Sequence, residues 1–275
     1  MEPMTTVDRA DPVTSDPASV DPDYPPTLAT ILLDSGGATM HGLLYVANGP
    51  GPHPTAILLH GYPGDEKNLD LAQAIRRCGW NALVFHYRGS WGSGGAYSVE
   101  HAVEDVLAAI DFCYQPGTQR SYRVDPERVA LVGHSMGAYV GLIAASQRPS
   151  IGSICFMAGI NLSQSFVYPE YREAAVSYLD ALGHGAVVGV KWADESTKIV
   201  ANLARYDLLQ LVPALDGRRL LFIAATEDDN ANQNELVEQI KSRTHADVTT
   251  AEFADDHVFS SHRIALARLI TGWLK

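Results

Sequence analysis

Charged residues are scarce in this 275-residue chain, and cations are scarcer than anions. Only 19% of the residues are charged, and 20 lysines and arginines stand against 32 aspartates and glutamates, for a formal net charge of −12. Nucleic acids are bound by clustered cations, so this balance argues against a nucleic-acid partner. Because 46% of the residues are hydrophobic, we expect the chain to fill the core of one large domain.

Cysteines and long apolar runs are also few. Cys78, Cys113 and Cys155 are odd in number, far apart and set among apolar neighbours, which indicates buried free thiols rather than disulfides or a zinc site. No apolar run approaches the roughly 18 residues of a membrane-spanning helix, and the first residues lack the basic and apolar parts of a signal peptide. We therefore expect a cytoplasmic protein with no membrane partner.

Motifs for metals and nucleotides are missing as well. The sequence contains no H-E-x-x-H pair, no cysteine pair and no Walker phosphate-binding loop. We therefore expect no metal and no cofactor.

The chain divides into a short tail and one domain. Residues 1–27 are rich in Pro, Asp, Ser and Thr and show neither a helical nor a strand period, so they are expected to form a disordered acidic tail. From residue 28 to 275 the pattern is that of a folded domain. The segments 28–34 and 40–47 read as two antiparallel strands joined by a turn at Ser35, Gly36 and Gly37.

After residue 54, short apolar runs alternate with amphipathic helical stretches. Continuous apolar runs are typical of strands covered on both faces, and such alternation predicts an α/β fold with a doubly wound, mostly parallel sheet. The predicted strands are 56–59, 82–85, 129–132, 154–157, 220–225 and 248–253, and the predicted helices are 69–78, 99–113, a stretch after Ser135, 232–243 and 260–274.

One segment interrupts this alternation. Residues 161–212 are too many for a simple connection and contain helical patches at 170–182 and 196–209. Ligands bind at the carboxyl ends of the strands in open α/β sheets. We therefore expect this segment to be a small helical lid over that edge.

The strongest chemical signal is Gly133-His134-Ser135-Met136-Gly137, between a predicted strand and a predicted helix. The pattern G-x-S-x-G in this position is the nucleophile elbow, a sharp, strained turn that exposes a serine. Its two glycines are needed because side chains there would clash with the neighbouring strand and helix. Ser135 is therefore the predicted nucleophile, the alternative being a turn whose serine caps the helix.

A second signal is His60-Gly61-Tyr62-Pro63-Gly64, directly after an apolar run. A serine that attacks a carbonyl carbon needs two amide donors for the oxyanion that develops. We expect the N–H groups of Tyr62 and Met136 to form this oxyanion hole, with His60 supporting the loop.

These motifs, together with His86-Tyr87-Arg88-Gly89-Ser90-Trp91-Gly92-Ser93-Gly94-Gly95, resemble the α/β-hydrolase superfamily from about residue 28 to the C-terminus. They look like its esterase and prolyl-oligopeptidase-like branches rather than the haloalkane dehalogenases, whose nucleophile is an aspartate. The resemblance implies the α/β-hydrolase fold and a catalytic triad in the chain order Ser, Asp, His.

The resemblance also implies where the acid and the base lie. In this superfamily the acid follows the penultimate strand, and the usual spacing selects Asp228 over Asp229 and Glu227. The base is expected as His257, in the loop before the last helix, with a pKa suited to proton transfer. His262 is the alternative, but we expect it to lie already inside that helix.

Other polar residues near these motifs are expected to have no chemical role. We expect His134 to pack beside the nucleophile and Asp256 to hold the loop around His257. The acidic pairs Asp65/Glu66 and Glu104/Asp105 are expected near helix starts or on solvated faces.

Aromatic residues around the lid are candidates for substrate binding. Trp91, Phe166, Tyr168 and Trp192 are the four we single out, because such side chains can line an apolar acyl pocket. The alternative is that they form the small core of the lid itself.

The sequence thus predicts a serine hydrolase, a carboxylesterase that cleaves small-molecule acyl substrates through Ser135, Asp228 and His257. A peptidase or amidase is the hydrolytic alternative. An acyltransferase, a cyclase or a carbon–carbon bond enzyme on the same scaffold is the non-hydrolytic one, and a binding protein without catalysis is a third class. The sequence does not choose between a monomer and a homo-oligomer formed through the sheet edge or the lid.

Overall fold

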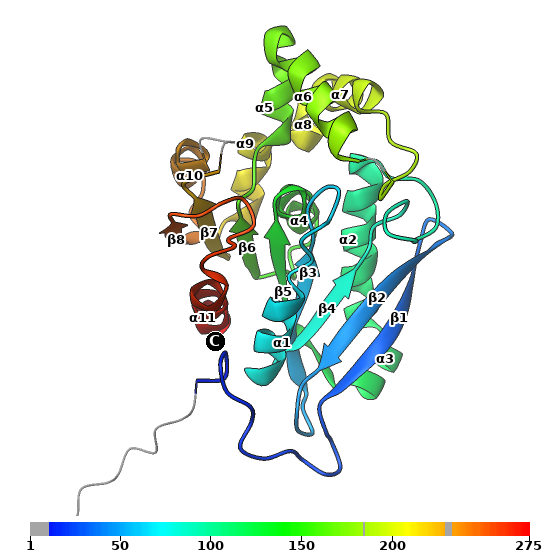
Figure 1. The fold of residues 1–275 in the computed structure, drawn as a ribbon, viewed down its shortest axis with the longest axis vertical. Coiled ribbons are helices and arrows are strands. Elements are labelled where there is room, and N and C mark those ends of the chain that lie inside the picture. Colours follow the sequence, from blue (N-terminus) through cyan, green and yellow to red (C-terminus); the bar gives the residue numbers. More distant parts are fainter. Residues whose placement is uncertain (1–10, 184, 229–232) are drawn as a thin grey trace, which may run out of the picture.

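The computed structural model describes residues 11–183, 185–228 and 233–275. Within them, eight strands form one sheet in the spatial order β1-β2-β4-β3-β5-β6-β7-β8 (Figure 1). β1 and β2 pair antiparallel, as do β2 and β4, while all pairs from β4 to β8 are parallel. The strands are β1 (Thr27–Ser35), β2 (Ala38–Val46), β3 (His53–Leu59), β4 (Asn81–Phe85), β5 (Val124–His134), β6 (Ser153–Met157), β7 (Arg219–Ala225) and β8 (Asp247–Phe253).

The predicted α/β fold with a mostly parallel sheet is confirmed. Every predicted strand is present, and the first two are joined by a turn in which Gly36 and Gly37 both have positive φ. The central strands β3 and β4 are buried along their whole length, as expected of strands that helices cover on both faces.

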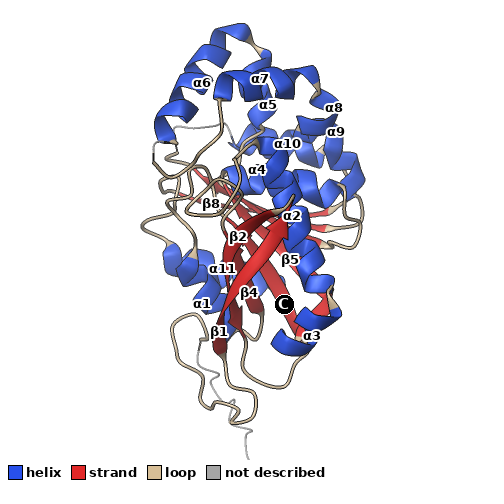
Figure 2. Ribbon diagram, turned by 90° about the vertical axis from the view of Figure 1, so that its right-hand side faces the viewer, coloured by secondary structure: helices blue, strands red, loops and turns tan. Residues whose placement is uncertain are grey.

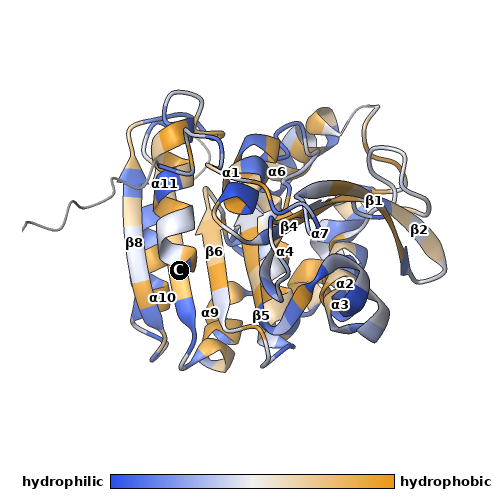
Figure 3. Ribbon diagram, turned by 90° about the horizontal axis from the view of Figure 1, so that it is seen from below, coloured by the Kyte–Doolittle hydropathy of each residue, from blue (hydrophilic) through white to orange (hydrophobic). Residues whose placement is uncertain are grey.

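Helices cover both faces of the sheet (Figure 3). One face carries α1 (Leu69–Arg77) and α11 (Arg263–Leu274), and the other carries α2 (Val99–Tyr114), α3 (Pro116–Tyr122), α4 (Met136–Ser146) and α10 (Gln233–Lys241). The sheet divides the buried apolar side chains into two clusters, one on each of its faces. The helix α4 is enclosed on all sides, since Met136 to Ala145 are all buried.

The inserted segment forms a helical layer above the carboxyl ends of the parallel strands (Figure 2). It comprises α5 (Leu162–Val167), α6 (Pro169–Leu182), α7 (Trp192–Ala201), α8 (Leu203–Tyr206) and α9 (Leu208–Leu211), followed by the 3-10 turn η1 (Val212–Leu215). The expected patch 170–182 corresponds to α6. The patch expected at 196–209 is instead divided among three helices, because the backbone leaves the helical region at Asn202 and the Asp207 side chain caps Leu209 N–H at 3.1 Å.

Buried charges tie α2 to the loop after β4. Asp105 is fully buried, and its carboxylate accepts hydrogen bonds from Arg88 N–H at 2.8 Å and Arg88 Nε at 2.6 Å. The expectation that Asp105 lies at a helix start or on a solvated face was therefore wrong. The Arg88 partner, 17 residues away along the chain, holds this carboxylate inside the domain.

Residues 11–26 run outside the sheet without forming a helix or a strand. Val13 is buried in the cluster under α1 and α11. Arg77 donates to the carbonyl oxygens of Pro12 and Val13, and Arg268 pairs with Asp11 at 2.7 Å. The first ten residues of the expected tail lie outside the described residues.

The cysteines form no disulfide among the described residues, and the helices give a separate finding on membrane crossing. Cys78, Cys113 and Cys155 are free, and burial raises the pKa of the Cys113 thiol to about 12. No helix in residues 11–183, 185–228 and 233–275 combines the length and apolar character needed to cross a membrane.

Candidate active site

Ser135 lies at the sharp turn between β5 and α4. Its backbone has φ 57° and ψ −122°, a conformation that a residue with a side chain adopts only under strain. The turn is held by a hydrogen bond from Ser135 N–H to the Met157 carbonyl at 2.9 Å. A Cβ at Gly133 would come within 2.5 Å of Ala138 Cα, and one at Gly137 would overlap the Leu59 carbonyl. Both glycines of the motif are therefore required by close packing.

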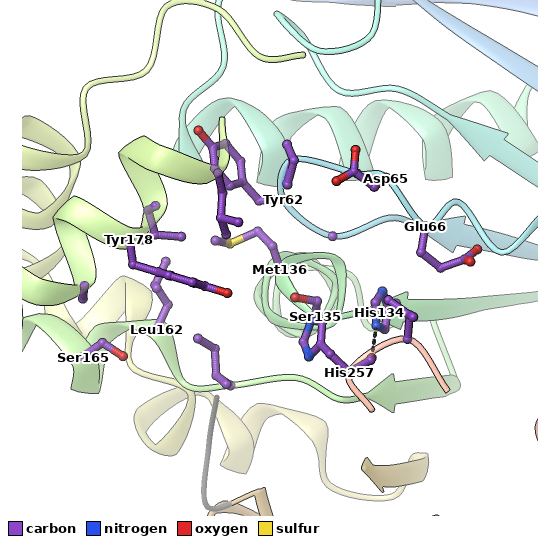
Figure 4. A pocket seen from close by; sticks show the side chains of 18 of the residues that line it. Tyr62, Asp65, Glu66, His134, Ser135, Met136, Leu162, Ser165, Tyr178 and His257 are labelled. Atoms are coloured by element: carbon purple, nitrogen blue, oxygen red, sulfur yellow. Dashed lines mark hydrogen bonds between the residues drawn. The ribbon is translucent and has the colours of Figure 1, made fainter. Parts of the chain in front are cut away.

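His257 lies in the loop between β8 and α11, and Figure 4 shows its ring beside the Ser135 side chain. Its Nδ1 is 2.6 Å from Oδ2 of Asp228, a carboxylate that is almost fully buried at the end of β7. Nδ1 therefore donates to the carboxylate, which leaves Nε2 as the nitrogen available to the serine. The structure thus brings Ser135, Asp228 and His257 together from three separate loops.

Of the other two candidates for the acid, only Glu227 belongs to the described residues, and it is exposed. Glu227 precedes Asp228 in the turn, and its N–H donates to the Asp255 carbonyl at 3.1 Å. Asp229 lies outside the described residues.

His262 stands just before α11 rather than inside it, because α11 begins at Arg263. Its Nδ1 pairs with Asp255 at 2.9 Å. Asp256 accepts the N–H groups of Val258 and Ser260 at 3.1 and 3.0 Å. These two aspartates therefore shape the loop that carries His257, and neither is its partner.

Two backbone amides beside Ser135 are without an acceptor. Within the described residues, neither Tyr62 N–H nor Met136 N–H donates to a protein oxygen. Gly61 brings the Tyr62 loop against the nucleophile, since a Cβ there would be 3.0 Å from Ser135 Cβ and 3.3 Å from its Oγ. Buried amides are normally paired, so two unpaired ones beside a strained serine are suited to hold an anionic oxygen.

His60 supports this loop through a hydrogen bond to its backbone. It is buried, and its Nδ1 is hydrogen-bonded to the Gly61 carbonyl at 2.7 Å. Burial lowers the pKa of His60 to about 3, so the ring is neutral near pH 7.

His134 and Gln233 hold the partners of Ser135, and the sequence had suggested neither role. His134 Nε2 donates to the His257 carbonyl at 2.7 Å, drawn as the dashed line in Figure 4. Burial, followed by the neighbouring His257, lowers the pKa of His134 to about 4 and keeps it neutral. Gln233 donates to Asp228 Oδ2 at 2.8 Å and accepts Ala225 N–H at 3.1 Å. The contact of His134 joins segments far apart in the sequence, and those of Gln233 depend on the direction in which its side chain points. No local sequence motif therefore indicates either one.

A cavity of about 450 Å³ opens between Ser135 and the lid. Its lid side is apolar, with hydroxyl groups only from Tyr178 and Ser165, and Figure 4 shows Asp65 and Glu66 on the opposite side of Ser135. No lysine or arginine is among the described residues that line it. The apolar lining residues on the lid side are Ile160, Leu162, Ala174, Ala175, Leu179 and Leu182.

The four aromatic residues expected to bind substrate do not line this cavity. Phe166 and Trp192 are fully buried in the core of the lid. Tyr168 is half exposed on the lid surface. Trp91 donates from Nε1 to the Pro63 carbonyl at 2.8 Å, and Lys67 Nζ lies 3.6 Å above its ring. Aromatic content suggested a pocket lining, but the direction of each side chain depends on tertiary packing.

Metal ligands are not gathered in the described segments, where no three His, Cys, Asp or Glu side chains stand close enough to hold an ion.

Comparisons with known proteins bear on the family and the fold. A model of the alpha/beta hydrolase family matches residues 56–269. An uncharacterized protein of Mycobacterium tuberculosis is 32% identical over 114 residues, which cover 41% of this chain and 39% of that protein. The chain thus matches about two fifths of the length of this relative.

Two esterases are similar in structure. Est1E from Butyrivibrio proteoclasticus, solved with ferulic acid bound, has a TM-score of 0.66 at 14% identity over 89% of this chain and 97% of that one. The esterase Pf2001 of Pyrococcus furiosus has a TM-score of 0.65 at 17% identity over 92% and 91%. At such identities the likeness concerns the fold.

Proposed function

The chain belongs to the alpha/beta hydrolase family, and we propose that it is a serine hydrolase, a carboxylesterase acting on small acyl substrates. The observation that carries this proposal is the convergence at one cavity of a strained serine, a His257–Asp228 pair at 2.6 Å and two unpaired amides. These are the nucleophile, the oriented base and the oxyanion donors that acyl transfer requires.

In the first half of the reaction, Ser135 Oγ bonds to the ester carbonyl carbon while its proton passes to His257 Nε2. The electron pair of the carbonyl π bond moves to oxygen, where the N–H groups of Tyr62 and Met136 stabilise the charge. Asp228 stabilises the imidazolium through its hydrogen bond to Nδ1. As the tetrahedral intermediate collapses, the alkoxide leaves with the proton from His257, and an acyl-enzyme remains.

In the second half, His257 takes a proton from water, whose oxygen attacks the acyl carbon. The same two amides hold the second oxyanion. Its collapse breaks the bond to Ser135 Oγ, which recovers its proton from His257, and the carboxylic acid leaves.

The cavity supports an uncharged, compact acyl group. A volume of about 450 Å³ is in the range of small-molecule sites. The apolar lid side offers no cation for an anionic acyl chain among its described residues. Two of the similar structures are esterases, one of them holding ferulic acid.

Labelling with a fluorophosphonate probe tests the nucleophile. We expect wild type to be labelled and Ser135→Ala not to be, with hydrolysis of p-nitrophenyl esters reduced about 10⁴-fold or more. The matched control is Ser165→Ala, a serine that lines the same cavity, which keeps its labelling. A folded wild type that neither labels nor hydrolyses any ester of the series from acetate to decanoate would contradict the proposal.

A further inference from the structure

Tyr62 faces two parts of the molecule at once. Its backbone N–H is one of the unpaired amides beside Ser135, while its side chain reaches into the lid. The Tyr62 ring stands edge-on to the Trp192 ring of α7, with centroids 4.9 Å apart at 87°. On another side it meets the ring of Tyr97 at 5.3 Å. The residue that offers an amide to the reaction is therefore packed against the lid.

The hydroxyl group of Tyr62 is closely packed against the lid. A Cβ added at Gly183, the residue after α6, would overlap the Tyr62 hydroxyl oxygen and come to 3.0 Å from Cζ. Burial raises the pKa of Tyr62, and the Trp192 indole opposes this rise, because its N–H group faces the hydroxyl. That indole nitrogen is fully buried and makes no well-formed hydrogen bond within the described residues. Gly183 and Trp192 thus enclose the Tyr62 hydroxyl between the ends of two lid helices.

The lid is itself anchored where it meets Tyr62. Val188 donates to the Gly89 carbonyl at 2.8 Å and accepts Tyr97 N–H at 2.9 Å. The buried carboxylate of Glu195 in α7 accepts Val99 N–H, the first residue of α2, at 3.1 Å. Carboxylates are favoured at helix N-termini. The base of the lid therefore has a fixed position relative to the sheet and can serve as a reference for Tyr62.

From this packing we propose that Gly183 and Trp192 are positioning residues, which hold the Tyr62 side chain so that its N–H points at the oxyanion. The inference rests on the proposed function. It assigns to the lid, beyond covering the substrate, the task of completing the oxyanion hole. Because the ring and the amide belong to one residue, a shift of the ring at its hydroxyl end tilts the donor.

Gly183→Ala tests the proposal. Gly183 has φ −75° and ψ −3°, which alanine adopts without strain, so the added methyl acts on the hydroxyl end of the Tyr62 side chain. With p-nitrophenyl acetate, which has the shortest acyl group of the ester series, we expect kcat to fall about tenfold or more while KM stays within about twofold. The control is Gly117→Ala, where an added Cβ meets nothing within 4 Å.

A double variant separates positioning from general damage. Tyr62→Phe removes the oxygen that the new methyl would strike and keeps the ring and the amide. We expect Gly183→Ala to lower kcat much less in the Tyr62→Phe background, where only the 3.0 Å approach to Cζ remains. If Gly183→Ala instead lowers kcat equally in both backgrounds, or leaves the wild-type kcat unchanged, the proposal is overturned.

A second variant covers the case in which Gly183→Ala does not fold, as judged by circular dichroism. Trp192→Phe keeps an aromatic ring in the lid core but removes the indole N–H that faces Tyr62. It should lower kcat for the acetate ester by about fivefold or more with KM unchanged. An unaltered kcat would count against positioning by the lid. Wild type that fails both labelling and hydrolysis would overturn the proposed function as well, whereas active wild type with indifferent variants overturns this inference alone.

Discussion

Two residues outside the proposed triad hold the loops that carry its base and its acid. His134 and Gln233 each make a hydrogen bond to a partner of Ser135, one to the His257 carbonyl and one to the Asp228 carboxylate. Both are buried. They fix the loop of the base and the loop of the acid relative to the sheet, and so they set the geometry in which a proton can pass.

Replacing His134 by phenylalanine should slow the enzyme without weakening substrate binding. The ring volume is retained, but the His257 carbonyl loses its donor and the loop loses one fixed point. We expect kcat on p-nitrophenyl acetate to fall about tenfold with KM within about twofold. His134→Gln, which offers an amide N–H to the same carbonyl, should recover part of the loss. Equal kcat in wild type and His134→Phe would show that the contact has no part in positioning.

At the scale of single residues, the sequence predicted those candidate site residues that belong to recognisable local motifs. Ser135 and Tyr62 were predicted from short Gly-rich patterns beside strands, and Asp228 and His257 from what the resemblance to the α/β-hydrolase superfamily implies about the last two strands. The contact from His134 to His257 spans 123 positions, and Trp192 turned inward into the lid core. Both depend on tertiary packing, which hydrophobic pattern alone does not specify.

Among the elements, α2 connects the sheet to the lid. Its buried Asp105 holds Arg88 at the start of the loop that pairs with the lid, and its first N–H is held by Glu195 of α7. The lid itself was only partly predictable. Its position and α6 followed from the interrupted alternation, whereas the division at Asn202 and Asp207 needed the capping role of polar side chains within an apolar pattern.

Removal of the Asp105 carboxylate should destabilise the domain strongly. Asp105→Ala leaves the Arg88 guanidinium without its buried partner, and we expect the free energy of unfolding to fall by about 3–5 kcal/mol. The matched control is Asp111→Ala on the same helix. Asp111 pairs with Arg148 at 3.0 Å on the surface, and its loss should cost less than about 1 kcal/mol. Urea unfolding followed by circular dichroism compares the two, and similar costs would refute the assigned role.

For the whole molecule, buried neutral histidines make stability depend on pH. Burial lowers the pKa of His60 to about 3 and that of His134 to about 4, from 6.5. In this range the unfolded chain binds more protons than the folded one. The stability that depends on these neutral rings is therefore fully present above about pH 6.5 and is lost as the pH falls toward 4 and then 3.

We expect the free energy of unfolding to be lower at pH 4.5 than at pH 7, by on the order of 2 kcal/mol for each of these two histidines. Urea titrations at the two pH values measure the difference. Other groups titrate in the same window, so the His134→Phe variant supplies the comparison and should show a smaller decrease than wild type. An identical pH dependence in the two proteins would contradict the burial argument for His134.

The enclosure of α4 sets the order in which parts of the molecule open. Its residues from Met136 to Ala145 are all buried among the sheet and the surrounding helices, so we expect its amide protons to be among the slowest of the described residues to exchange. In α6, Leu179 alone is buried, and this helix can fray by itself. The proposed nucleophile therefore stands at the start of an enclosed helix, while the cavity beside it is bounded on the lid side by a mostly exposed one.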